Sequence, residues 1–177
     1  MIKRALFLFT TLVVTAQGVA AQNRDSARAD YFRAVAGFFS LPESEIAILS
    51  DWETPADEIP VVLFMARRAG VSPEALVALR SSGQSWTRLA GQYGVSAATL
   101  HVPIRDDASA GALSAVYVAF RGTPVSEWPG IPLSDSDIVA LVNVRVLAQS
   151  LGLSPDAVLR DTGSAPSFVQ LFARLKR

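Results

Sequence analysis

The sequence of 177 residues contains no cysteine and only one histidine, His101. Without cysteine the chain has no disulfide, no thiolate nucleophile and no thiolate metal ligand. A single histidine excludes a metal site built from several histidines, and any proton relay through imidazole has to use His101. Stability must therefore come from packing, and we predict no cofactor and no metal.

An excess of charge of one sign is also missing, because 16 basic residues balance 16 acidic ones. Such a surface lacks the broad positive field that nucleic acid or anionic lipid requires. After the N-terminus, no segment reaches the roughly 18 uninterrupted apolar residues of a membrane span. We therefore expect no nucleic-acid partner and no stable membrane insertion of the mature chain.

The N-terminus has the three parts of an export signal. A positively charged start is followed by an apolar run from Ala5 to Ala16 and then by small residues at positions 19 and 21. The apolar run is too short to span a membrane. We predict that residues 1–21 are a signal peptide cut after Ala21, or alternatively after Ala20, and that the mature protein is periplasmic or secreted.

Five segments of the first half recur in the same order about 80 residues later. For example, "GVSPEAL" (70–76) matches "GLSPDAV" (152–158), and "SWTRLAGQY" (85–93) matches "SFVQLFARL" (167–175). Five matches in one order predict a duplication. We expect one helical unit at 26–104, a linker at 105–112 and a second unit at 113–177, together forming one compact domain.

The repeated motif also predicts helix ends. Ser72 and Ser154 stand before proline, and a serine oxygen followed by proline is typical of a helix start. Gly70 and Gly152 lie just before these serines, where the preceding helix would end in a left-handed residue.

The segments 61–66 and 138–142 carry no charge, which indicates helices that are buried on both sides. We predict an all-α fold in which two duplicated helical units pack around these two apolar central helices. Strands are the alternative, because "IVALVNVRVLA" (138–148) is rich in β-branched residues.

The stretch "SWTRLAGQYGVSAATL" (85–100) resembles a DNA-reading helix-turn-helix, with Ala90, Gly94 and Leu100 at the positions such a motif requires. A recognition helix needs another turn or two bearing residues that reach base edges. Here Pro103 and two aspartates follow instead. A helix-turn-helix nucleic-acid binder therefore stays only an alternative, which the export signal opposes.

The longer stretch "SGQSWTRLAGQYGVSAATL" (82–100) is similar to the first half of a lysin motif (LysM), a peptidoglycan- and chitin-binding module. That resemblance implies a β-α-α-β module, with strands before Gly83 and at "TLHVPI" (99–104), and glycan binding through Trp86 and Tyr93. The whole arrangement also resembles uncharacterised exported bacterial helical-repeat proteins with a Gly-x-Ser-Trp motif, a resemblance that implies no activity.

Two pairs of residues recur at corresponding places and are candidates for binding a partner. Trp52 and Trp128 lie near loops rich in proline, serine and acidic residues, where aromatic residues anchor interfaces. The alternative is that they close the ends of the core. Arg80 and Arg160 precede helix-ending glycines, where a cation stabilises the helix C-terminus; as binding residues they would favour an anion or a carboxylate of the partner.

The sequence offers no clear catalytic set. His101 is followed by Asp106 and Asp107, and serines occur at 81, 82 and 85, but "GQSWT" lacks the final glycine of a nucleophile elbow. The acidic loop "SDWETPADE" (50–58) lacks the spacing and glycine of a calcium loop. We expect an exported, non-catalytic helical binding or scaffolding protein of the bacterial cell envelope. Its partner would be an envelope protein or, alternatively, a cell-wall glycan.

Overall fold

The computed structural model describes residues 11–176, and this part of the chain contains helices and no strand, so the fold is all-α. Side chains are described from Ala21 onward. The helices are α1 (Thr11–Phe39), α2 (Glu43–Asp51), α3 (Ile59–Ala69), α4 (Pro73–Ser81), α5 (Trp86–Gln92), α6 (Ala97–Leu100), α7 (Ser114–Gly122), α8 (Asp135–Leu151), α9 (Pro155–Asp161) and α10 (Phe168–Leu175). Short 3-10 turns lie at η1 (Ala56–Glu58), η2 (Gly111–Leu113), η3 (Val125–Gly130) and η4 (Thr162–Ser164). The strand alternative is therefore wrong for residues 11–176.

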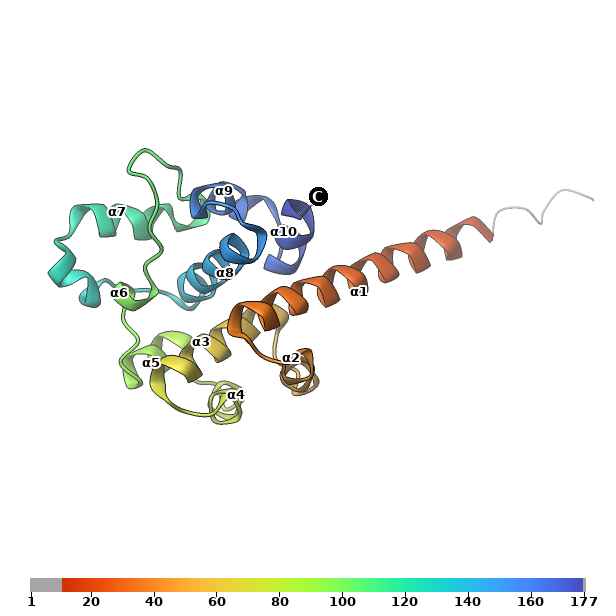
Figure 1. Cartoon of the computed structure of the whole chain (residues 1–177), viewed down its shortest axis with the longest axis horizontal. Helices are drawn as coiled ribbons and strands as arrows, with labels where there is room; N and C mark the ends of the chain where they lie inside the picture. Colours follow the sequence, from red (N-terminus) through yellow and green to blue (C-terminus); the bar gives the residue numbers. More distant parts are fainter. Residues whose placement is uncertain (1–10, 177) are drawn as a thin grey trace, which may run out of the picture.

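The first ten residues of the predicted signal peptide lie outside the described part of the chain. From Thr11, α1 continues without a break through the predicted cut at Ala21 to Phe39. Figure 1 shows its N-terminal end extending beyond the other helices, while its C-terminal half packs against α8 and α10.

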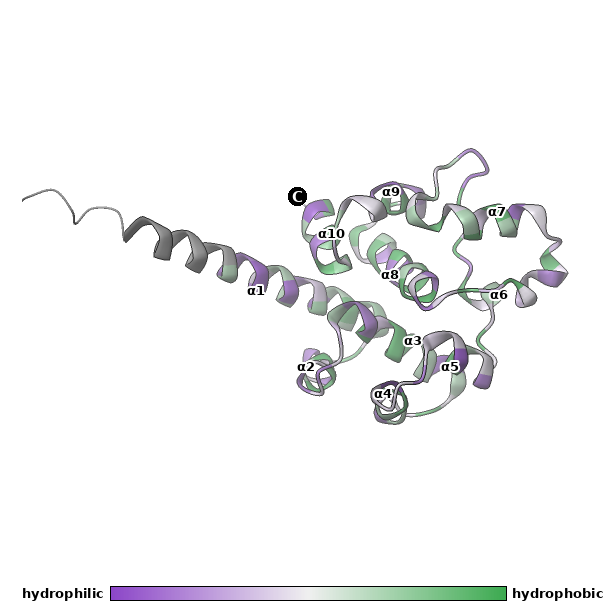
Figure 2. Ribbon diagram, turned by 180° about the vertical axis from the view of Figure 1, so that it is seen from behind, coloured by the Kyte–Doolittle hydropathy of each residue, from purple (hydrophilic) through white to green (hydrophobic). Residues whose placement is uncertain are grey.

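The two uncharged segments form neighbouring helices in the core. All residues of α3 from Ile59 to Ala66 are buried, and α8 is buried along most of its length. The two helices pack directly against each other, and Figure 2 shows how apolar α3 is. A helix without a polar face needs cover on all sides; α3 is covered by α2, α4 and α8, and α8 by α1, α3, α5, α9 and α10.

The helix ends follow the local signals in the sequence. The Ser72 and Ser154 hydroxyls accept hydrogen bonds from the N–H groups of Ala75 and Ala157. Gly70 and Gly152 end α3 and α8 with left-handed φ values of 68° and 65°. These predictions are confirmed, and they are what a duplication would produce; the duplication itself stays a prediction.

The two halves of the chain exchange carboxylate caps. Asp57, just before α3, accepts from the N–H groups of Phe168 and Val169 at the start of α10, at 3.0 and 3.3 Å. Asp135, the first residue of α8, accepts from the N–H groups of Trp86 and Thr87 at the start of α5, both at 2.9 Å. Each carboxylate therefore neutralises the positive end of a helix in the other half.

A buried polar network ties α1 to the centre. The hydroxyl of Tyr31 donates to the side-chain oxygen of Asn143 in α8. The Asn143 amide donates to the carbonyls of Asp57 and Val139, each at 2.8 Å. Both Tyr31 and Asn143 are fully buried, so the network fixes how α1 sits on α8.

Candidate functional site

A cavity of about 320 Å³ lies where α2, η1, α3 and α4 meet, and it brings together two of the residues that the sequence singled out, Trp52 and Arg80. Figure 1 shows α2, α3 and α4 in the lower part of the view. We call the cavity the Trp52 pocket. Its lining residues are Trp52, Glu53, Thr54, Pro55, Glu58, Val62, Val77, Arg80 and Ser81.

The end of α2 places the aromatic wall of this pocket. Trp52 is the C-cap of α2, and Glu53 follows with a left-handed φ of 57° before the chain turns at Pro55 into η1. Trp52 is 41% exposed as a residue, and Ile48, one turn earlier on α2, is 43% exposed. An apolar strip of surface therefore borders the pocket.

Another wall of the pocket is an ion-pair network around Arg80. Its guanidinium donates to both carboxylate oxygens of Glu58 at 3.0 Å, and its Nη1 lies 3.4 Å from an oxygen of Asp135. It also donates to the carbonyl of Gln84 at 2.8 Å and stacks 5.1 Å above the Trp86 ring. The hydrogen bonds with Glu58, the largest influence, raise the pKa of Arg80.

These contacts argue against Arg80 as a receptor for an anion or for a carboxylate of a partner. Its donors face two carboxylates and a carbonyl of the chain itself. Although partial burial opposes the charged form of Asp135, hydrogen bonds from Thr87 and Trp86 together with Arg80 hold its pKa below the usual value. The Glu58–Arg80–Asp135 group therefore carries one net negative charge.

Buried polar atoms without a partner gather around the same place. In the described part of the chain, the buried side-chain atoms without a hydrogen bond are Thr54 Oγ1, Gln84 Oε1 and Trp86 Nε1. Thr54 lines the pocket, whereas Gln84 and Trp86 both contact Arg80. Such orphaned groups are rare in folded proteins and call for an explanation. Of the three, only the Thr54 hydroxyl belongs to the lining of the Trp52 pocket, where a ligand could satisfy it.

The surroundings of the pocket are acidic. Residues 34–66 contain six acidic residues and no basic one. Of these, Asp51 and Glu53 are exposed next to Trp52, and Glu53 lines the cavity. The candidate site thus combines an exposed indole, two hydroxyls, an apolar floor and a carboxylate rim.

The second pair of candidates lies elsewhere. Trp128 is half-buried and donates its indole N–H to the carbonyls of Phe120 and Thr123, both at 3.0 Å. Its ring centre lies 4.3 Å from that of His101. Trp128 therefore closes one end of the core, which was the alternative interpretation. Arg160 is exposed on α9 and does not line the Trp52 pocket.

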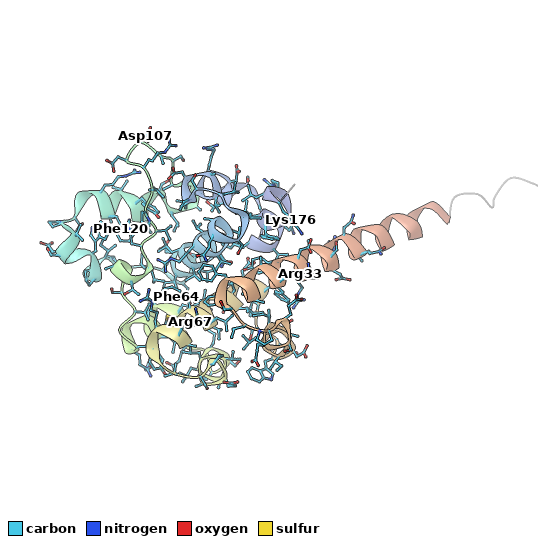
Figure 3. All side chains as sticks on the ribbon, in the orientation of Figure 1. Arg33, Phe64, Arg67, Asp107, Phe120 and Lys176 are labelled. Atoms are coloured by element: carbon cyan, nitrogen blue, oxygen red, sulfur yellow. The ribbon has the colours of Figure 1, made fainter. Side chains whose placement is uncertain are left out.

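His101 is a packing residue in this structure. Its ring contacts those of Tyr117, Phe120 and Trp128, and burial, followed by the charge of Arg145, lowers its pKa. Figure 3 shows Asp107 at the outer end of the loop between α6 and α7. Among the described side chains, no hydrogen bond joins His101 to a carboxylate, and no cluster of metal-ligating residues is found.

The helix-turn-helix stretch forms two short helices around Gly94, which has a φ of 67°. The second helix, α6, has four residues and ends at His101, which is too short for a recognition helix. The first strand of a lysin motif would fall in α4, and 101–104 is irregular, so the structure lacks that module's β-α-α-β order. Trp86 is fully buried and Tyr93 half-buried; a glycan cannot stack on the Trp86 ring in this arrangement.

No family model, no curated protein and no solved structure matches this chain. Within the residues that the structure describes, no helix has both the length and the apolar character needed to cross a membrane.

Proposed function

We propose that the mature chain is an exported, non-catalytic helical protein that binds or scaffolds another protein of the bacterial cell envelope, and that it does so through the Trp52 pocket. The observation that carries this proposal is the exposed Trp52 side chain beside a cavity walled by Arg80. Export rests on the N-terminal sequence, and binding rests on this surface.

The composition of the surface suits protein binding. Tryptophan and arginine are the residues most enriched among those that dominate binding energy at interfaces. Trp52 and Ile48 offer apolar area at one helix end, while the Glu58–Arg80 pair fixes the wall behind them. A cavity of about 320 Å³ is large enough to receive a side chain of a partner.

Export is tested by fractionating cells that express the full chain and measuring the intact mass of the recovered protein. A protein recovered outside the cytoplasm and starting at Gln22 or Ala21 supports the proposal. A protein that stays in the cytoplasm with residues 1–21 attached overturns it.

Binding is tested with a photo-cross-linking amino acid placed at Ile48, beside the pocket. The matched control is the same substitution at Val118, which is 67% exposed on α7. We expect a discrete adduct with an envelope protein from position 48 that disappears when Trp52→Ala is added. Identical adducts from both positions would contradict a specific surface.

A further inference from the structure

We propose that the Trp52 pocket recognises a cationic side chain, that of lysine or arginine, on a segment of the partner protein. This inference rests on the proposed binding function and adds the chemistry of the ligand. It follows from three properties of the pocket: its aromatic wall, its charge and its buried apolar lining.

The aromatic wall offers a face for a cation. An ammonium or guanidinium group over an indole ring gains about 0.5–1 kcal/mol at an exposed site and more when it is partly desolvated. Trp52 presents such a ring beside the cavity, since 41% of the residue is exposed. The other two indoles are not available, because Trp86 is fully buried and Trp128 packs against His101.

The charge of the pocket selects the sign of the ligand. Arg80, the basic residue of the lining, is paired with Glu58 and lies within 3.4 Å of Asp135. Glu53 adds an exposed carboxylate with no ion pair among the described residues. A ligand anion would meet the carboxylate of Glu53 and an Arg80 that is already paired, whereas a cation would pair with Glu53.

The apolar lining of the pocket suits a long aliphatic side chain that ends in a charge. Val62 and Val77 form buried apolar walls, which match the methylene stem of lysine or arginine. Thr54 contributes a buried hydroxyl with no partner, and Ser81 a second hydroxyl. Both are acceptors for the N–H groups of a cation.

The experiment uses the purified full chain and short peptides as probes. The peptide acetyl-Gly-Arg-Gly-amide is compared with the same peptide carrying citrulline, which keeps the shape of arginine without its charge. Binding is followed by the NMR signals of the three indole N–H groups, assigned with Trp52→Phe. We expect the arginine peptide to shift the Trp52 signal, to leave those of Trp86 and Trp128 in place, and to bind at least fivefold more tightly than the citrulline peptide.

Two neighbouring charges give a matched pair of variants. Glu53→Gln removes a carboxylate that lines the pocket, whereas Asp51→Asn removes one two residues away that does not. Both change the net charge equally, so a general field effect would weaken binding equally. We expect Glu53→Gln to weaken binding of the arginine peptide roughly threefold to tenfold and Asp51→Asn by less than twofold.

Several results would overturn the cation proposal: equal binding of the two peptides, equal effects of the two variants, or no shift of the Trp52 signal at tens of millimolar peptide. A shift caused by N,N′-diacetylchitobiose but not by arginine would make the pocket a saccharide site. A partner adduct at position 48 that persists in such cases would leave the proposed protein-binding function standing. If position 48 gives no adduct while the arginine peptide still binds more tightly than the citrulline peptide, the protein-binding function is refuted and the cation site stands.

Discussion

Replacing Tyr31 with phenylalanine probes the network that holds α1 on the core. The substitution removes one hydroxyl and keeps the ring, which packs edge-on against Phe172 with ring centres 6.0 Å apart. The lost hydrogen bond leaves the side-chain oxygen of Asn143 without its donor in a fully buried position. An unsatisfied buried acceptor costs about 1–3 kcal/mol, so we expect the free energy of unfolding to fall by about 2 kcal/mol.

The assay is urea unfolding followed by circular dichroism, with Tyr93→Phe as the control. Tyr93 is half-buried, and its hydroxyl makes no hydrogen bond among the described residues. We therefore expect the control to change stability by less than about 0.5 kcal/mol.

A double-mutant cycle isolates the pair. Asn143→Leu also breaks the hydrogen bonds to the carbonyls of Asp57 and Val139, so on its own it should cost more than Tyr31→Phe. In the double variant the oxygen and the hydroxyl are both absent, and we expect a coupling energy of about 1–2 kcal/mol. If the two substitutions add, or if Tyr31→Phe costs no more than Tyr93→Phe, the network does not hold α1 as described.

Three further changes test the electrostatics and the backbone. The folded-state pKa of His101 lies below its ordinary value of 6.5. The contribution of His101 to stability should therefore be complete above pH 6.5 and fall as the pH drops below that value. In a plot of the urea midpoint against pH, His101→Phe should make the decline below pH 6.5 shallower. Burial raises the pKa of Asp57 above 3.8. The contribution of Asp57 to the free energy of unfolding should therefore be largest below pH 3.8 and decline as the pH rises through the folded-state pKa, and Asp57→Asn should remove this decline. Asp135, whose pKa is lowered, should contribute the opposite trend in both proteins. Gly111→Ala should destabilise by more than 2 kcal/mol in the same assay, since φ is +52° and the new methyl group would overlap the Leu159 carbonyl oxygen, whereas Gly91→Ala has open space and should be neutral or slightly stabilising.

The two central helices and the helix ends at the repeated motif could be predicted because the signals that set them are local. Ser72 with the following proline begins α4, and Gly152 ends α8, through contacts within a few residues. The uncharged run of α3 identified a buried helix in the same way. Helix ends depend on hydrogen bonds to the free backbone groups of the first and last turn, and a buried helix is recognised by its own lack of charge. Both can be read from residues that are close together in the sequence.

The site was predictable only in part, because its members come from different elements. Trp52 and Arg80 were singled out since each recurs in the second half, but the same reasoning chose Trp128, whose indole N–H is taken up by two carbonyls inside the fold. Thr54 was missed, and Glu53 was considered only as part of the acidic loop 50–58, not as part of a pocket. A signal for Glu53 was present, namely six acidic and no basic residues over 34–66; nothing local showed that the Thr54 hydroxyl would be buried without a partner.

The charge of the pocket depends on the contact between the two halves of the chain. Asp135 caps α5 through the N–H groups of Trp86 and Thr87, and the same carboxylate lies 3.4 Å from Arg80. The residue that turns Arg80 from an available cation into a compensated one therefore lies 55 positions away and starts α8. From its own half alone, Arg80 has one carboxylate partner and the Glu58–Arg80 pair is neutral. With α8 in place, Arg80 faces a second carboxylate and is not available to an anion, so the preference of the Trp52 pocket for a cation depends on the contact between the two halves.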